Sequence, residues 1–121
     1  MSTWTFDTAS GRLAHDGTYA ATGYAGHGPG KDNPADADIP NVGPPPRGLY
    51  TIGTARTDPR LGPLAMPITP APSTPMFGRS GFWIHGDNPV HPGDSSEGCI
   101  VLPQAARAAI SSSGDTALLI T

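Results

Sequence analysis

Residues 82–102 read FWIHGDNPVHPGDSSEGCIVL. The apolar run Phe82–Ile84 predicts a short buried strand that delivers His85 to the loop that follows it. A second apolar run, Ile100–Leu102, comes directly after Cys99, which is the only cysteine in the chain. Polar and turn-forming residues separate the two runs, so the chain can fold back between them. We therefore expect that the chain between the two runs can bring His85 beside Cys99.

The rest of the chain indicates one small, mostly-β domain over residues 1–121. Only Pro103–Ser111 is typical of a helix, because it starts with proline, is rich in alanine and is closed by Gly114. Residues 26–47 predict a long loop, and residues 57–76 hold so many prolines that we expect only edge strands or loop there. Alternating apolar residues and turn dipeptides predict strands at Thr3–Asp7, Arg12–His15, Thr18–Thr22, Gly48–Arg56 and Thr116–Thr121.

Glycine and proline are unusually abundant, with 16 Gly and 15 Pro among 121 residues. Such a content approaches that of disordered chains, but only 14% of the residues are charged and 36% are hydrophobic, which favours a folded, loop-rich domain. The two residue types concentrate in the segments 26–48, 57–76 and 86–98. We expect the first and third segments to carry a substrate groove and the Cys99 turn, and we assign no role to the second.

Charge and composition argue against several classes of partner. The seven basic residues are scattered and the net charge is −3, so a nucleic-acid surface is not expected. No apolar run approaches the roughly 20 residues that span a bilayer. The N-terminal sequence MSTWTFDTAS has no basic or apolar region typical of a secretory signal. A single cysteine cannot form an internal disulfide.

The pairing of a histidine with a cysteine points to nucleophilic chemistry. A thiol attacks as a thiolate, and a neighbouring imidazole is a common means of forming one. Gly98 would let a substrate approach the backbone, and the amides around Cys99 could bind an oxyanion. A lone cysteine before an aliphatic run is more often a core residue. The combination of His85-Gly86 with Ser96-x-Gly98-Cys99 favours the nucleophile.

These residues resemble the active-site signature of L,D-transpeptidases of the YkuD type. They are more similar to the L,D-transpeptidase-like effectors of type VI secretion, the Tlde1 group, whose motif is a His followed by Ser-x-Gly-Cys. Residues 31–34 (KDNP), 39–44 (IPNVGP) and 46–53 (PRGLYTIG) also look like segments of that group. The opening TWTFDTASGRLAHDG fits its N-terminal hairpin, so the resemblance covers most of the chain.

The resemblance implies a β-sandwich-like L,D-transpeptidase-type domain that needs no cofactor. It implies Cys99 as nucleophile and His85 as its base, with Ser96 and Gly98 shaping the turn and the oxyanion site. The implied substrates are peptidoglycan tetrapeptide stems, attacked at the bond between the L-centre of diaminopimelate and D-Ala. The acyl group would pass to water, to a free D-amino acid or to another stem, and hydrolysis or exchange is favoured.

Other residues are candidates for binding this substrate. Arg47, Lys31 and Arg79 could meet its carboxylates. Asp87 could orient a histidine or bind the ammonium group of the substrate, and Gly86 would lie beside the substrate.

One position departs from the YkuD pattern, because Glu97 stands where those enzymes have histidine. We expect the Glu97 side chain to point away from the thiol. His91 is the nearest substitute, but its setting reads as a surface loop.

Two rival functions remain open at this point. His85, His91 and Cys99, with Asp87 or Asp94, could hold zinc, although their spacing matches no familiar zinc motif. The domain could also be a non-catalytic cell-wall-binding module.

The expected substrate, together with the expectation that the chain encodes no secretory signal, suggests where the protein acts. The resemblance implies a protein made in the cytoplasm, secreted, and active in the periplasm of a target bacterium. It also implies a secretion-machine carrier and an immunity protein as partners.

Overall fold

The computed structural model describes residues 2–87, 96 and 98–121 and is mostly β with one α-helix, α1 (Gln104–Ser113). Two short 3₁₀ turns, η1 (Gly28–Gly30) and η2 (Pro34–Asp36), lie in the long loop before the fifth strand. The strands are β1 (Thr3–Asp7), β2 (Arg12–His15), β3 (Thr18–Thr22), β4 (Tyr24–Ala25), β5 (Gly48–Ile52), β6 (Arg56–Asp58), β7 (Gly62–Pro70), β8 (Trp83–His85), β9 (Ile100–Val101) and β10 (Ala117–Ile120).

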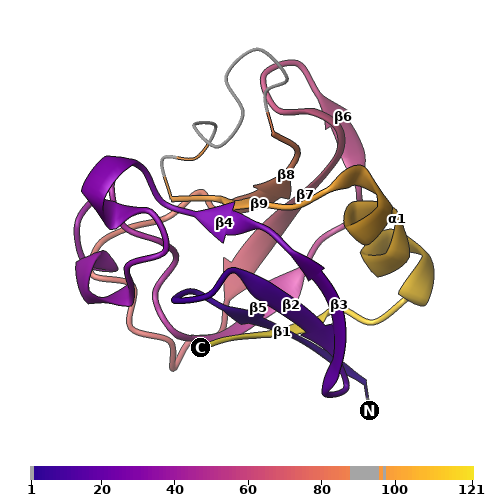
Figure 1. Cartoon of the computed structure of the whole chain (residues 1–121), viewed down its shortest axis with the longest axis horizontal. Helices are drawn as coiled ribbons and strands as arrows, with labels where there is room; N and C mark the ends of the chain where they lie inside the picture. The colour runs from indigo at the N-terminus through magenta and orange to yellow at the C-terminus, as the bar shows by residue number, and fades with distance from the viewer. Residues whose placement is uncertain (1, 88–95, 97) are drawn as a thin grey trace.

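The described strands form one hydrogen-bonded path in the order β3-β2-β1-β10-β5-β7-β8-β9-β4, and β6 pairs with β7 beside this path. β1 and β10 are parallel, as are β8 and β9, whereas the other pairs are antiparallel. Figure 1 shows β1, β2, β3 and β5 in the lower half of the molecule and β4, β8 and β9 in the upper half. The sheet is therefore bent over, and its two halves enclose the core in a sandwich-like arrangement.

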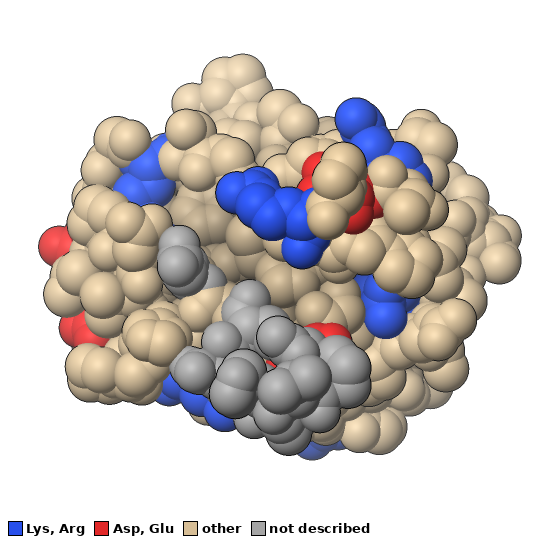
Figure 2. Space-filling model, turned by 90° about the horizontal axis from the view of Figure 1, so that it is seen from above, with Lys and Arg blue, Asp and Glu red and all other residues tan. Residues whose placement is uncertain are grey.

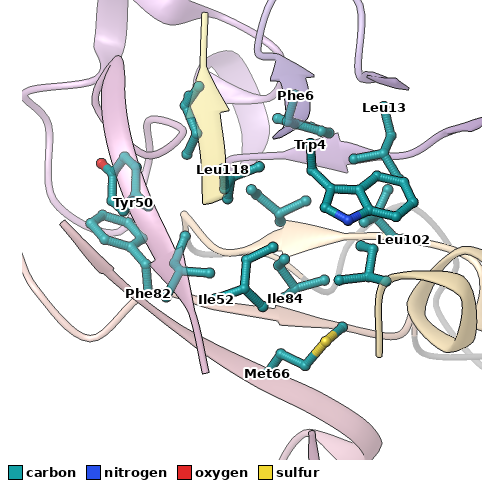
Figure 3. Packing of buried hydrophobic residues seen from close by; sticks show 14 of the residues in the cluster. Trp4, Phe6, Leu13, Tyr50, Ile52, Met66, Phe82, Ile84, Leu102 and Leu118 are labelled. Carbon is teal, nitrogen blue, oxygen red and sulfur yellow. The ribbon is translucent and has the colours of Figure 1, made fainter. Parts of the chain in front are cut away.

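The core lies between these two halves. Trp4, Phe6 and Leu118 come from β1 and β10, and their side chains face those of Met66 and Ile84 from β7 and β8 (Figure 3). All five are at most 3% exposed. Burying a side chain of this size stabilises the fold by about 1.5–3 kcal/mol, so the bent sheet is held mainly by its apolar inner face.

The N-terminal strands confirm the prediction from alternating residues, because β1, β2 and β3 have the predicted bounds. The predicted helix is also confirmed, and Gly114 closes it with a φ of +72°. Its start differs slightly, since Pro103 precedes the helix rather than occupying its first turn. The predicted strand Gly48–Arg56 is divided, because β5 ends at Ile52 and β6 begins at Arg56.

The expectation of only edge strands or loop over residues 57–76 is wrong. β7 runs for nine residues in the middle of the sheet, between β5 and β8. Pro67 is tolerated in this central strand because the hydrogen bonds to the neighbouring strands do not require the N–H group that proline lacks. Its carbonyl accepts from Gly53 N–H at 2.7 Å, and the N–H of the next residue, Ile68, donates to the carbonyl of Phe82 at 3.0 Å. β7 is thereby the strand on which β8 and His85 rest.

The two ends of the chain are pinned together near α1. His15 Nε2 lies 2.7 Å from a carboxylate oxygen of Asp115, and the His15 ring stacks on Trp4 with the ring centroids 4.1 Å apart. Trp4 Nε1 donates to Ser113 Oγ at 3.2 Å. These contacts give His15 a structural role. No helix in the described part of the chain has the length and apolar character needed to cross a membrane.

Candidate active site

Cys99 and His85 lie on the same side of two paired strands. β8 and β9 are parallel, with Ile84 opposite Ile100, and both isoleucines belong to the core. Because successive side chains alternate between the two faces of a strand, the neighbours His85 and Cys99 point away from that core. Trp83 N–H donates to Cys99 Sγ at 3.4 Å, which places the sulfur beside β8. Both His85 and Cys99 line one cavity of about 560 Å³.

A single buried hydroxyl organises the turn that holds Cys99. Ser96 Oγ accepts hydrogen bonds from the N–H groups of Gly26 at 2.9 Å and Gly98 at 3.0 Å. The same hydroxyl donates to the carbonyl oxygen of Cys99 at 2.6 Å. Since Gly26 follows β4, Ser96 also ties the turn to the neighbouring strand. Ser96 is 1% exposed, so these three bonds form away from water.

His85 is held in one tautomer. Its Nδ1 lies 2.8 Å from the carbonyl oxygen of Gly86, and because a carbonyl can only accept, Nδ1 carries the proton. Nε2 is then the basic nitrogen. Burial is the main cause that lowers the pKa of His85 below its usual 6.5, and the charge of Arg107 lowers it further. The Gly86 hydrogen bond and Asp87 act in the opposite direction. The ring is therefore neutral at pH 7 and can take up a proton.

A buried arginine, Arg79, lies beside Cys99 and holds the loop of residues 37–44 by hydrogen bonds. Its guanidinium stacks over Phe82, with Cζ 4.8 Å from the ring centroid. Burial lowers the pKa of Arg79, and the charges of Tyr50, Cys99 and Asp38 oppose that effect, so the guanidinium also attracts a thiolate at Cys99. Its hydrogen bonds go to backbone carbonyls, those of Ala37 at 2.6 Å, Pro44 at 2.9 Å and Gly43 at 2.9 Å.

Two glycines allow the close approach of these arginines. Gly98 has a φ of +137°, and a Cβ there would lie 2.6 Å from Arg79 Nη2 and 3.0 Å from Phe82 Cε1. A Cβ on Gly86 would lie 2.6 Å from Arg107 Nη2. Any side chain at either position would therefore displace the guanidinium of Arg79 or of Arg107.

Arg107 supports His85 from the side of α1. It is 7% exposed and donates from Nε to the carbonyl of Leu102 at 3.1 Å and from Nη1 to that of Pro63 at 2.6 Å. Leu102 N–H in turn donates to the carbonyl of His85 at 3.0 Å. Arg107 thus joins the helix, the start of β7 and the strand end that carries the imidazole.

The cavity opens on the face shown in Figure 2, where Lys and Arg side chains border a hollow in the surface. Its described lining includes two arginines and two histidines and no Asp or Glu. Arg60 and Leu61 come from the turn between β6 and β7, inside the segment 57–76 to which the sequence assigned no role. The other lining residues are His27, Pro40 and Asn41 from the long loop, Gly78, Arg79, Ser80, Gly81, Phe82 and Trp83 around the start of β8, and the pair His85 and Cys99.

A family model of the Tlde1 domain matches residues 19–115, which are 97 of the 121 residues. The chain belongs to the Tlde1 family of type VI secretion effectors. The matched range contains every residue of the described cavity lining, and the resemblance found in the sequence is confirmed. A comparison with curated proteins finds no match.

The fold of this Tlde1 domain is similar to that of a solved L,D-transpeptidase. The catalytic domain of the E. faecium enzyme, determined by NMR as acylated by ertapenem, superposes with a TM-score of 0.50 at 17% identity. The match covers 99% of this chain and 96% of that chain. At this identity the similarity establishes the fold, and it confirms the expected mostly-β, L,D-transpeptidase-type architecture.

The other substrate-binding candidates of the Tlde1 domain lie elsewhere. Lys31 and Arg47 are exposed and are absent from the described lining of the cavity. Lys31 Nζ lies 4.4 Å from the centroid of the Tyr24 ring, and Tyr24 donates its hydroxyl to Asp87 Oδ1 at 2.8 Å. Asp87 thus accepts a hydrogen bond from Tyr24, and its charge raises the pKa of the His85 imidazole.

Some candidates cannot be placed on the site. His91, Asp94 and Glu97 fall outside the described residues. Among the residues that the structure describes, no three His, Cys, Asp or Glu side chains are grouped so that they could hold a metal ion. Sequence reasoning missed Arg60, Trp83 and Arg107. The positions of these side chains depend on the pairing of β7 with β8 and on the packing of α1 against β7, and no local sequence motif predicts these contacts.

Proposed function

We propose that the protein is a cysteine-dependent acyl transferase or hydrolase of peptidoglycan stem peptides. The observation that carries the proposal is that Cys99 and His85, on the same face of the paired strands β8 and β9, both line one cavity. Membership of the Tlde1 family supports a cell-wall-acting effector. The L,D-transpeptidase-type fold supports attack at the bond between the L-centre of diaminopimelate and D-Ala.

In the first half of the reaction, His85 Nε2 takes the proton of the Cys99 thiol. The thiolate attacks the carbonyl carbon of the diaminopimelate L-centre and forms a C–S bond. The carbonyl electron pair moves to oxygen, where backbone N–H groups of the Cys99 turn would stabilise the charge. When the C–N bond breaks, the imidazolium gives its proton to the departing amine of D-Ala. A thioester on Cys99 remains.

In the second half, an acceptor attacks that thioester. Neutral His85 takes a proton from water or from the amine of an acceptor, the new C–O or C–N bond forms, and the C–S bond breaks. The sulfur leaves as a thiolate, which then regains the proton from His85. The Gly86 hydrogen bond keeps Nε2 directed to the cavity through both halves.

The deciding experiment is incubation with purified tetrapeptide muropeptides, followed by mass spectrometry of the products. Wild-type protein should release one alanine by hydrolysis, or exchange it when a free D-amino acid is supplied. Muropeptide dimers would show transpeptidation instead. Cys99→Ala and His85→Gln should give the profile of the untreated substrate. If Cys99→Ala, confirmed as folded by circular dichroism, gives the wild-type products, the proposed chemistry is wrong.

We propose further that the protein acts in the periplasm of a target bacterium, after delivery through a type VI machine. Expression in a test bacterium distinguishes the compartments. A version exported by an added signal sequence should arrest growth, the same export of Cys99→Ala should not, and the cytoplasmic version should be tolerated. Equal toxicity of the exported wild type and Cys99→Ala would count against this proposal.

A further inference from the structure

The described lining of the cavity carries the opposite charge to the chain as a whole. The protein has a net charge of −3, yet the charged side chains of the described lining are Arg60 and Arg79, and it includes no carboxylate. A cationic lining on an acidic protein attracts an anionic ligand and disfavours binding of a cationic one. The group that enters this cavity is therefore expected to bear negative charge.

The two arginines of the described lining differ in the exposure and the hydrogen bonds of their guanidinium groups. Arg79 is 9% exposed and donates from both terminal nitrogens to backbone carbonyls, so its donors are largely committed to the protein. Arg60 is exposed, and among the described residues no hydrogen bond or ion pair joins its guanidinium to a protein acceptor. The nearby Asp58 carboxylate accepts from the backbone N–H groups of Arg60 at 2.8 Å and Leu61 at 3.0 Å. Arg60 therefore has its planar donor face available to a ligand.

Arg60 is also presented by a well-defined turn. Asp58 pairs with Gly62 across the β6–β7 hairpin, and Gly62 takes a φ of +84°, which favours glycine. Pro59 restricts the first position of the turn. β7 then continues to the register Met66 opposite Ile84, one residue before His85. The turn that carries Arg60 is thus joined through β7 to β8, which carries His85, and both residues line the same cavity.

We propose that Arg60 is a specificity-determining residue that binds a carboxylate of the stem peptide. The inference rests on the proposed function. A guanidinium forms two parallel hydrogen bonds to a carboxylate, which an amide of the same shape cannot match. A tetrapeptide stem offers two such groups close to the attacked bond, the terminal carboxylate of D-Ala and the free carboxylate of diaminopimelate. Arg60 would hold one of them while Cys99 attacks.

The test combines enzyme variants with amidated substrates. Wild type, Arg60→Gln, Arg60→Lys and Arg12→Gln are assayed on the tetrapeptide, on its terminal carboxamide and on its diaminopimelate carboxamide. Arg12 is the matched control, because it is an exposed arginine of β2 outside the described lining. Arg60→Gln should lower kcat/KM on the unmodified substrate by about 10- to 100-fold, mainly through KM, as expected for a charge-assisted hydrogen-bond pair. Arg60→Lys should retain part of that activity, and Arg12→Gln all of it.

The amidated substrates identify the carboxylate. On the substrate whose bound carboxylate has been replaced, wild type and Arg60→Gln should be equally slow. On the other carboxamide they should differ as on the unmodified peptide. An equal loss by Arg60→Gln on all three substrates would overturn the inference in favour of a general electrostatic or structural effect. No loss on any of them would overturn it as well.

Binding separates this inference from the proposed reaction. The tetrapeptide is titrated into Cys99→Ala and into Cys99→Ala/Arg60→Gln by isothermal calorimetry. Arg60-dependent binding without turnover by the wild type would support the Arg60 site and refute the reaction. Wild-type turnover that the Arg60→Gln substitution does not change would refute only the Arg60 site. The absence of both binding and turnover would refute both proposals.

Discussion

Replacing Ser96 by alanine removes the hydroxyl that organises the Cys99 turn. The hydroxyl makes three hydrogen bonds at 2.6–3.0 Å, and its loss leaves two N–H groups and one carbonyl without that partner in a buried place. An unsatisfied buried group costs about 1–3 kcal/mol, so with partial relaxation we expect a loss of about 3 kcal/mol. At about 4 °C per kcal/mol for a domain of this size, the melting temperature should fall by about 12 °C.

Thermal unfolding followed by circular dichroism measures this directly. Ser80→Ala is the control, since Ser80 is an exposed serine of the same cavity lining, and its melting temperature should stay within about 2 °C of the wild type. Below the transition, Ser96→Ala should also lose roughly 100-fold in activity if Cys99 moves by about 1 Å. If Ser96→Ala melts at the same temperature as the wild type, the Ser96 hydroxyl does not stabilise the Cys99 turn.

The remaining predictions concern backbone geometry and pH. Gly98→Ala should destabilise the protein by about 3 kcal/mol or more, because the new Cβ meets Arg79 and Phe82. Gly114→Ala, also at positive φ but facing open space, should cost about 1 kcal/mol. Urea denaturation compares the two variants, and equal costs would contradict the crowding at Gly98. The lowered pKa of His85 means that the unfolded chain binds more protons below pH 6.5, so stability from the neutral ring is present above pH 6.5 and is lost as the pH falls through the folded pKa. Denaturation between about pH 7 and 5 should therefore show a steeper loss in the wild type than in His85→Gln, and parallel curves would argue against a buried neutral ring. For the same reason the acid limb of kcat/KM should lie below 6.5, and an acid limb above that value would contradict this account of His85.

The strands that were predicted correctly are those whose bounds follow from short-range residue patterns. Strands β1, β2 and β3 alternate apolar and polar residues between turn dipeptides, so their bounds could be found without knowledge of their partners. β7 could not, because its prolines suggest an edge strand. Pro67 fits a central strand only because its neighbour Ile68 supplies the N–H and its own carbonyl accepts from Gly53. That arrangement depends on strands distant in the sequence.

The same distinction applies to the site. Cys99 and His85 could be chosen as candidates because a motif joins them within one short segment. Arg60 lies 25 positions before His85 in the numbering and reaches the cavity only through the pairing of β6, β7 and β8. By residue type, Lys31 and Arg47 were equally good candidates for binding a carboxylate, but both lie outside the described lining of the cavity. Residue types therefore suggested nucleophilic chemistry at Cys99 and His85, whereas the register of the sheet determines which basic side chain lines their cavity.

The most direct test of the central claim is to locate the covalent intermediate. Wild-type protein is mixed with an isotopically labelled tetrapeptide stem, quenched rapidly in acid and mapped by peptide mass spectrometry. A thioester is expected on the peptide that contains Cys99, with the mass of the stem less its terminal D-Ala, and no adduct is expected in Cys99→Ala. Turnover that persists in Cys99→Ala, or an adduct on any other residue, would contradict the central claim.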